Sequence, residues 1–231
     1  MKNNVQIPLP ILNRELPSFS NFVAGENNEV VEALRAFSTF KESSFILLSG
    51  ISGSGVSHLM QAGAFLSSEL GFQALYLSLS EVGLKSEILL NLNSMDCLYI
   101  DDVDQVFEQS DWEEALFHLY NQCKDNSKSL IMGTHYEAPV KKPKLRDLQS
   151  RLAGMVPYSL KRLSDEEKLI AIMQKFNSYG LTIQKEVAQY LLNRMPRDMR
   201  NLMNNIEKLD QVSLSAKRGI TIPFIKEVFD G

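Results

Sequence analysis

Residues 45–60 read FILLSGISGSGVSHLM: a short apolar run, then three glycines, then the start of an amphipathic segment. This order predicts a buried strand, a glycine-rich loop and a helix. Such a loop turns successive backbone N–H groups toward one point, where the positive end of the helix dipole adds to them. Gly50, Gly53 and Gly55 supply the conformational freedom that the loop needs. The stretch therefore predicts a phosphate-binding loop.

One position departs from the pattern G-x-x-x-x-G-K-[ST]. Val56 stands where the lysine that contacts the β- and γ-phosphates is expected, whereas Ser57 keeps the hydroxyl that can ligate Mg²⁺. We expect Ser54 and His58 to line the loop together with its glycines. Losing a charge-assisted contact costs about 1.5–3 kcal/mol. The γ-phosphate depends most on this lysine, so the loss should weaken binding of ATP more than binding of ADP. The alternative interpretation is a glycine-rich turn that binds nothing.

A second strand signal ends in two carboxylates, at Asp101 and Asp102. If both motifs lie at strand ends around one pocket, Asp101 can hold Mg²⁺ through water and Asp102 can orient an attacking water. An acidic turn after a strand is common, so the evidence for a nucleotide pocket is the occurrence of both motifs in one chain. Thr134 ends a further strand and is the candidate sensor of a γ-phosphate, although an ordinary strand-end threonine is an equal alternative. The sequence assigns no role to His135.

Strand and helix patterns alternate through the first two thirds of the chain. Strands are expected at 45–48, 74–79, 97–100, 129–133 and 158–160, with helices from residue 28, over 57–70 and over 111–124. This alternation predicts an α/β fold with a parallel sheet sandwiched by helices. After residue 163 only helical patterns follow: a capping box at 164–167 opens the first, and others are expected at 184–194, at 198–216 and after Pro223.

These patterns divide the chain into three parts: a tail at 1–18, an α/β domain at 19–162 and an all-helical lid domain at 163–231. The net charge of −4 disfavours a protein whose main task is gripping DNA, and the basic cluster at 141–146 is typical of a solvated loop. No apolar run approaches the roughly 18 residues of a membrane span, and no signal peptide is evident. We expect a cytoplasmic protein.

The layout resembles that of the AAA+ ATPases, and its details are similar to the DnaA-related family, most closely to its shortened Hda branch, the DnaA regulatory inactivators. The resemblance runs from about Pro17 to the C-terminus and rests on FVAGENN (22–28), SRL (150–152), LSDEEKL (163–169), MR (199–200) and TIPFIKE (221–227). An initiator would continue into a basic helix-turn-helix domain for DNA, which we do not expect here.

The resemblance implies roles for two arginines and for the tail. Arg151 is the expected arginine finger that enters the site of a neighbouring ATP-bound DnaA, and Arg200 is expected to reach the nucleotide from the lid. Gln6, Leu9 and Ile11 belong to a hexapeptide of the kind that docks on the DNA sliding clamp. A solvated arginine and a tail without a partner are the plainer alternatives.

The function that the resemblance implies is regulation of replication initiation. An ADP-loaded, clamp-tethered protein would stimulate hydrolysis of DnaA-bound ATP, with Mg²⁺ as a candidate cofactor and self-association as a homodimer or larger assembly left open. Two rival interpretations remain. One is an AAA+ ATPase or loader that uses Ser57, Asp101 and Asp102 for its own turnover, against which Val56 argues. The other is a nucleotide-free binding module tethered to the clamp.

Overall fold

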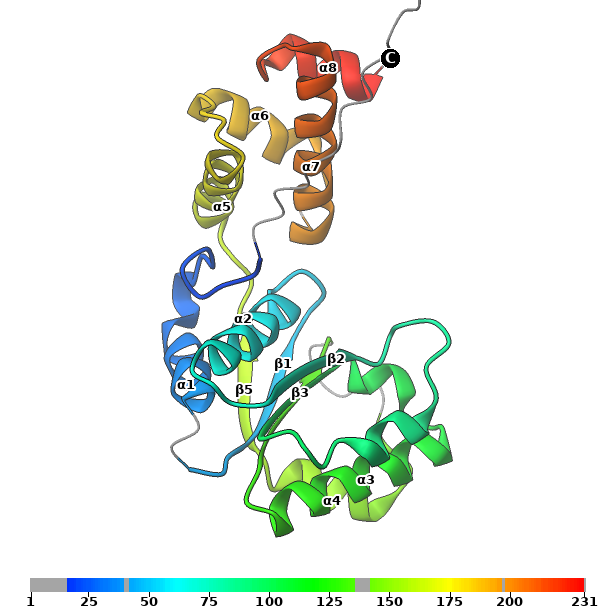
Figure 1. The fold of residues 1–231 in the computed structure, drawn as a ribbon. Coiled ribbons are helices and arrows are strands. Elements are labelled where there is room, and N and C mark those ends of the chain that lie inside the picture. Colours follow the sequence, from blue (N-terminus) through cyan, green and yellow to red (C-terminus); the bar gives the residue numbers. More distant parts are fainter. Residues whose placement is uncertain (1–15, 40–41, 136–141, 197, 231) are drawn as a thin grey trace, which may run out of the picture.

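The structure is a computed structural model that describes residues 16–39, 42–135, 142–196 and 198–230. An α/β part and a helical part lie one above the other, and the chain passes between them after the last strand (Figure 1). Within the described ranges, no helix is long and apolar enough to cross a membrane.

Five strands form one parallel sheet, which confirms the predicted fold class. In chain order the strands are β1 (Phe45–Gly50), β2 (Ala74–Ser78), β3 (Cys97–Asp101), β4 (Ser129–Thr134) and β5 (Val156–Leu160). Their order across the sheet is β2-β3-β4-β1-β5, so β1 lies between β4 and the edge strand β5. Every residue of β3 and β4 is buried, as expected of strands covered on both faces.

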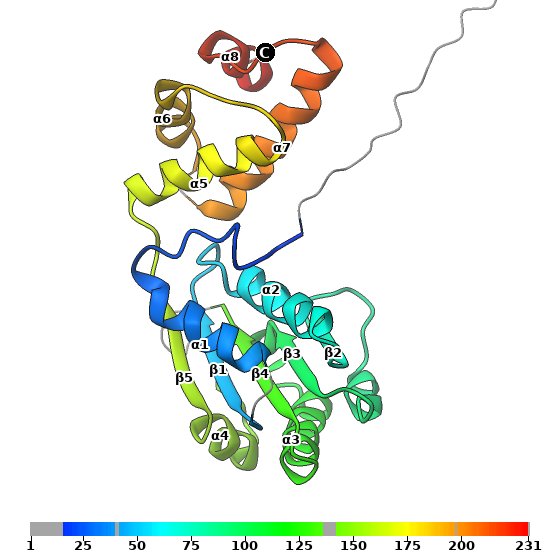
Figure 2. The ribbon, with the colours of Figure 1, turned by 60° about the vertical axis from the view of Figure 1, so that its left-hand side comes forward.

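Helices cover both faces of the sheet. The helices α1 (Asn28–Ser38) and α2 (Val56–Glu69) lie on one face, and α3 (Ser110–Asp125) and α4 (Arg146–Ala153) lie on the other (Figure 2). Short 3-10 helices occur at η1 (Gly25–Asn27), η2 (Ser86–Asn91) and η3 (Val103–Val106).

Each face has its own apolar core, because successive residues of a strand point to opposite faces. On β3, Cys97 and Tyr99 belong to the core under α1 and α2, whereas Leu98 and Ile100 belong to the core under α3. The second cysteine, Cys123, lies in the α3 core, and both thiols are free and buried. The two cysteines therefore lie on opposite sides of the sheet.

The helical part consists of α5 (Asp165–Ser178), α6 (Lys185–Arg194), α7 (Met199–Ala216) and α8 (Ile222–Asp230). The predicted capping box opens α5: the Ser164 hydroxyl accepts the N–H of Glu167 at 3.2 Å, and the Glu167 carboxylate accepts the N–H of Ser164 at 2.7 Å. The helices enclose a third core, which includes Phe176 and Phe224.

Asn27 links the segment before α1 to the residue that follows β5. Its buried side chain accepts the N–H of Lys161 at 2.7 Å and donates to the carbonyl of the same residue at 3.1 Å. The exposed ammonium of Lys161 pairs with Glu26 at 2.8 Å. The segment that enters α1 and the segment that leads to α5 are therefore fixed to each other.

Candidate functional site

The glycine-rich loop connects the end of β1 to the first residue of α2. Gly53 and Gly55 have φ values of +80° and +103°, a region that favours glycine. A Cβ atom at Gly55 would lie 2.5 Å from the ring of Phe22, and one at Gly53 would lie 3.2 Å from the backbone nitrogen of Met199. The loop is therefore held closely between the N-terminal segment and the start of α7.

Val56 packs into the protein at the N-terminus of α2, beside the cavity. It is only 1% exposed and belongs to the core under α1 and α2. Its two methyl groups fit between strand ends, since Cβ atoms built at Gly50 and Gly133 would lie 3.1 and 3.2 Å from them. The phosphate loop thus offers backbone groups and hydroxyls but no cation of its own.

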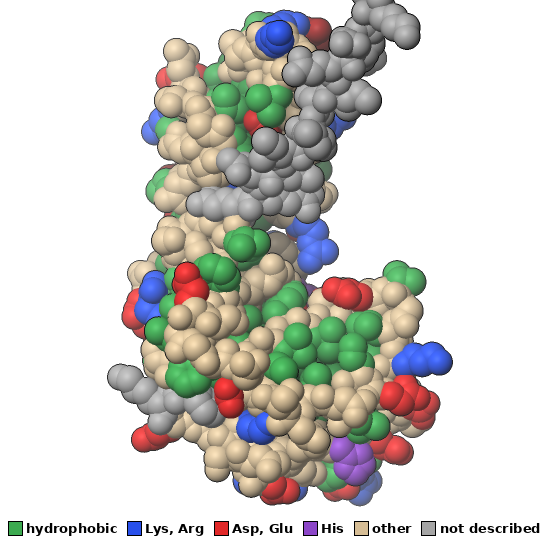
Figure 3. All heavy atoms as spheres, in the orientation of Figure 1, with side chains coloured by type: hydrophobic (Ala, Val, Ile, Leu, Met, Phe, Trp, Pro, Cys, Tyr) green, Lys and Arg blue, Asp and Glu red, His purple; other side chains and the backbone are tan. Residues whose placement is uncertain are grey.

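The loop opens into a cavity of about 660 Å³ between the α/β and helical parts. The molecular surface is hollowed at this level (Figure 3). Three segments line the cavity: the N-terminal segment with Leu16, Pro17, Asn21, Phe22 and Val23; the loop and α2 with Gly53, Ser54, Gly55, Val56, Ser57, His58 and Gln61; and the lid with Leu163, Ala171, Gln174, Lys175, Met199, Arg200, Met203, Asn204 and Glu207. His135 completes the lining. A volume of this size suits a small organic ligand.

The chemistry of the loop fits an anionic group. Residues 53–58 line the cavity at the N-terminus of α2, where backbone N–H groups have no partner within the helix. The hydroxyl of Ser54 is buried and accepts or donates no hydrogen bond among the described residues. A nucleoside diphosphate fits this arrangement, because its phosphates supply the missing acceptors while the apolar side chains on either side suit its base.

Asp101 lies at the end of β3 and is fully buried. Its Oδ1 lies 2.9 Å from Nε2 of His135 and accepts the N–H of Asp102 at 2.9 Å. Its Oδ2 accepts the hydroxyl of Tyr76 at 2.9 Å. Both carboxylate oxygens therefore already have partners within the protein.

The pair of Asp101 and His135 favours its charged form. Burial raises the pKa of Asp101, but the hydrogen bond and charge of His135, with hydrogen bonds from Ser57 and Tyr76, lower it below its usual value. Burial lowers the pKa of His135, but its hydrogen bond to Asp101 and the charges of nearby aspartates raise it above its usual value. The imidazolium thus neutralises the carboxylate locally.

Asp102 is engaged in the same way. Its Oδ2 accepts the hydroxyls of Ser78 at 2.5 Å and Ser80 at 2.9 Å, and its Oδ1 lies 3.3 Å from Nε2 of His135. The ligand atoms of Asp101, Asp102 and His135 lie within 4.8 Å of one another. However, a Mg²⁺ ion held by Ser57 and Asp101 would lie next to the imidazolium of His135, whose positive charge repels a cation, so the arrangement does not fit the expected metal well.

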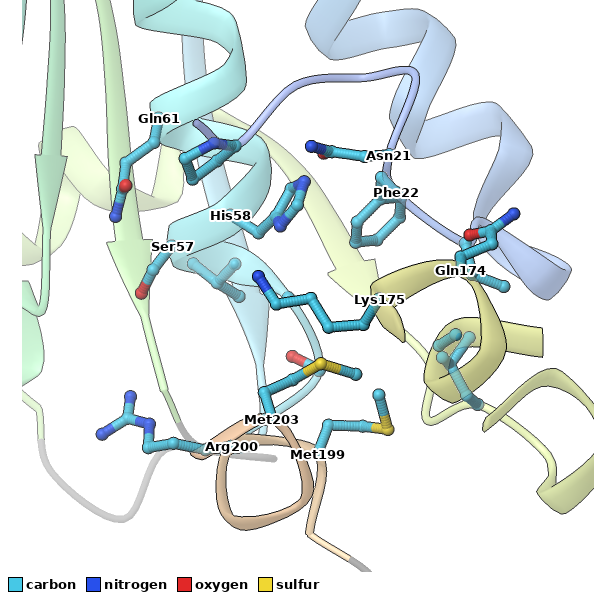
Figure 4. Close-up of a pocket in the computed structure, with 18 of the residues that line it drawn as sticks. Asn21, Phe22, Ser57, His58, Gln61, Gln174, Lys175, Met199, Arg200 and Met203 are labelled. Carbon is cyan, nitrogen blue, oxygen red and sulfur yellow. The ribbon is translucent and has the colours of Figure 1, made fainter. Parts of the chain in front are cut away.

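Two cations reach the cavity from the lid. Arg200 projects from the first turn of α7, and Lys175 extends from α5 (Figure 4). Arg200 is exposed and makes no ion pair among the described residues. The lid therefore brings the positive charge that the phosphate loop lacks.

Several predicted residues lie away from the cavity. Gly50, Asp101, Asp102 and Thr134 lie behind its lining, with Thr134 buried in register with Ser49 of β1. Arg151 lies on α4, which precedes β5 and therefore sits at the amino ends of the parallel strands, opposite the loop (Figure 1). The predicted clamp-binding residues Gln6, Leu9 and Ile11 lie outside the described residues.

Three features of the site have no counterpart among the sequence-based predictions. Lys175 lines the cavity, His135 pairs with both aspartates, and residues 16–18, which were assigned to the tail, lie against the cavity, with the carbonyl of Ser18 3.0 Å from Nε2 of His58. Helical spacing marks only the buried face of α5, and Lys175 lies outside that pattern. The basic residue near the end of a lid helix is the one signal that could have suggested it.

Two family models match consecutive parts of this chain. The model of the bacterial DnaA ATPase domain matches residues 12–160, and the model of the Hda lid domain matches residues 165–229. An uncharacterized protein from Haemophilus influenzae is 33% identical over an alignment of 231 positions, and the match covers 98% of this chain and 99% of that protein.

Solved structures share the fold at lower identity. Domain III of the Thermotoga maritima replication initiation protein DnaA has a TM-score of 0.79 at 19% identity, over 92% of this chain and 95% of that chain. AMPPCP-bound DnaA from Aquifex aeolicus has a TM-score of 0.70 at 20% identity, over 87% and 68%. The Thermotoga maritima RuvB Holliday junction branch migration motor has a TM-score of 0.69 at 16% identity, over 93% and 71%. These structures show similarity of fold.

Proposed function

We propose a function from one premise: this chain belongs to the DnaA-related AAA+ family and carries the Hda type of lid domain. Membership of this family connects the chain with DNA replication and with regulation of DnaA. More specifically, we propose that it is an ADP-bound regulator, tethered to the sliding clamp, that stimulates hydrolysis of DnaA-bound ATP and so inactivates the initiator.

The position of Arg151 carries this proposal. Because it lies at the amino ends of the strands, it cannot reach a nucleotide in its own cavity at their carboxyl ends. Its guanidinium lies 5.7 and 5.6 Å from the ring centroids of Phe117 and Tyr120, so α3 holds it in place while part of it stays accessible. An arginine presented to a neighbour's triphosphate neutralises charge in the transition state and is worth about 10³–10⁵ in rate.

The cavity of this chain has a different role in the proposal, which is to hold ADP without turnover. Val56 gives no cation to a γ-phosphate, and both oxygens of Asp102 are occupied by hydroxyls or by His135. The bound nucleotide would fix the lid against the loop, with Arg200 closing over the phosphates. The AMPPCP-bound initiator, whose fold is similar, supports a nucleotide as the ligand.

The proposed partners are DnaA, met head to tail through Arg151, and the sliding clamp, met through the tail. An extended segment with Gln6, Leu9 and Ile11 can place its apolar side chains in a groove, and its prolines reduce the entropy lost on ordering. Self-association would use the same head-to-tail surfaces.

The test is single-turnover hydrolysis of ATP pre-bound to DnaA, with sliding clamp loaded on DNA and ADP present. The intact protein should accelerate hydrolysis, and the acceleration should vanish in Arg151→Ala and after deletion of residues 6–11. Arg146→Ala removes an exposed arginine from the same helix and is the matched control, which should remain active.

Other outcomes favour the rival functions. No acceleration by the intact protein would sink the regulator proposal. Basal ATP hydrolysis that Asp101→Ala abolishes would identify an ATPase. An unchanged melting temperature in ADP would identify a nucleotide-free module.

A further inference from the structure

The phosphate loop carries no cation, whereas the lid carries two cations that line the same cavity. Val56 leaves the loop without a cation, and among the described residues of the lining only Lys175 and Arg200 carry a permanent positive charge. Both belong to the lid, on α5 and α7 respectively. A phosphate group at the loop therefore draws its positive side-chain contacts from across the cavity.

Lys175 is placed to make such a contact. In the close-up its side chain extends from α5 across the cavity, with its nitrogen toward the start of α2, where Ser57 and His58 lie (Figure 4). The residue is half-buried, so much of its stem is packed.

An aromatic ring holds the ammonium in this region. Nζ of Lys175 lies 4.9 Å from the ring centroid of Tyr179, the residue that follows α5, within the range of a cation–π contact. The contact restricts the flexible side chain without neutralising its charge. Less conformational entropy is therefore lost when the ammonium meets an anion.

We infer that Lys175 supplies to the phosphates of a bound nucleoside diphosphate the ammonium that the phosphate loop lacks at Val56. This inference rests on the proposed binding of nucleotide. The phosphates would then be bound by two parts of the chain. The loop would donate from N–H groups and hydroxyls, and the lid would supply the positive charge. Nucleotide affinity then depends on the position of the lid, which a lysine within the loop would not require.

The first test compares ADP and AMP by isothermal titration calorimetry with the full-length protein. Lys175→Met removes the charge and keeps the stem, and it should weaken ADP about tenfold to a few hundredfold. AMP, which lacks the β-phosphate, should lose much less. Lys185→Met makes the same change at an exposed lid position outside the cavity, and it should leave both affinities unchanged.

The second test places the lysine where the loop pattern has it. In Val56→Lys, the further change Lys175→Met should weaken ADP less than about threefold, because each lysine makes the other unnecessary. Lys175→Arg should keep most of the affinity of the parent protein, and this variant remains informative if Val56→Lys does not fold.

The outcomes separate this inference from the proposed function. ADP binding by the parent protein with equal affinity for Lys175→Met would overturn the role of Lys175 and leave the nucleotide site standing. An equal loss for ADP and AMP would also overturn it, because the contact would then lie at the base or ribose. No ADP binding by the parent protein would overturn both the nucleotide site and this inference.

Discussion

At the carboxyl ends of the strands, Asp101, Asp102 and His135 satisfy one another, whereas at the amino ends Arg151 lies against two aromatic rings and makes no ion pair among the described residues. A charge that is neutralised inside its own molecule is poorly placed for chemistry there. A guanidinium that contacts only aromatic rings is not neutralised, so it can still attract an anionic group on another molecule. In the proposed function the two ends of the sheet have different tasks, nucleotide binding at the carboxyl ends and action on a partner at the amino ends.

The largest expected effect concerns the segment that leads into α4. The buried carboxylate of Glu113 accepts the backbone N–H groups of Glu108 at 2.6 Å, Lys144 at 2.9 Å and Leu145 at 2.7 Å. Glu113→Ala leaves three donors without their acceptor and should lower the free energy of unfolding by about 4 kcal/mol. Urea denaturation measures the change.

The matched control for this variant is Glu114→Ala, which removes an exposed carboxylate one position later. It should leave stability within about 0.5 kcal/mol. Since Leu145 precedes the helix that carries Arg151, Glu113→Ala should also weaken stimulation of the partner while ADP binding at the opposite end persists. Equal losses of both activities would remove the distinction between the two ends.

Gly133→Ala should disrupt the packing at the carboxyl ends of the strands and leave the amino ends unchanged. A Cβ atom there would lie 2.5 Å from Oδ1 of Asp101 and 2.5 Å from the sulfur of Met60. Because three hydrogen bonds hold the carboxylate, relief requires backbone movement, and we expect a loss of about 3 kcal/mol. Gly219→Ala, where no atom lies within 4 Å of the added carbon, is the control for the same measurement.

Asn27→Ala should loosen the lid without disturbing either end of the sheet. It removes both hydrogen bonds to the backbone of Lys161, and we expect a loss of about 2 kcal/mol in thermal unfolding. Glu26→Gln, which removes only the exposed ion pair with the side chain of Lys161, should have no measurable effect. A larger effect from Glu26→Gln than from Asn27→Ala would contradict this view of the junction.

The smallest expected effect is on the pH dependence of stability. Because the pKa of His135 is raised in the folded state, its stabilising contribution is complete below its ordinary pKa of 6.5 and is lost as pH rises through the raised value. The lowered pKa of Asp101 removes the contribution only when pH falls through that lower value. The melting-temperature difference between the parent protein and His135→Gln should therefore shrink toward alkaline pH.

Substitution of an exposed histidine is the control for this comparison. His118→Gln on α3 should leave the pH profile of the parent protein unchanged. A difference between the parent protein and His135→Gln that stays constant from pH 6 to 9 would contradict an ionised pair at the carboxyl end.

The sequence predicted the elements well because their signals are local. Apolar runs marked the first four strands and a shorter signal at 158–160 marked the fifth, whereas α4 was not predicted. Ser164 and Glu167 form the predicted capping box three residues apart. The residues at 53–58 meet at the cavity because a strand, a loop and a helix are consecutive there. Such short-range patterns need no knowledge of tertiary contacts.

Contacts between residues far apart in the sequence could not be predicted from such short-range patterns. Glu113 meets Lys144 31 residues away, and His135 meets Asp101 34 residues away. Lys175 reaches the cavity only because the lid packs above the loop. Thr134 and His135 are neighbours, and the direction of the chain after β4 decides which of the two lines the cavity.

The two buried cysteines make the native protein convenient for chemical labelling. Burial raises the pKa of both thiols to about 11, so the reactive thiolate is scarce at neutral pH. Since Cys97 and Cys123 lie in the cores on opposite faces of the sheet, their reaction with a thiol reagent would report the opening of each face separately. A fluorophore on a cysteine introduced at an exposed position should therefore attach selectively, and the assembly with a partner could be followed with both native thiols in place.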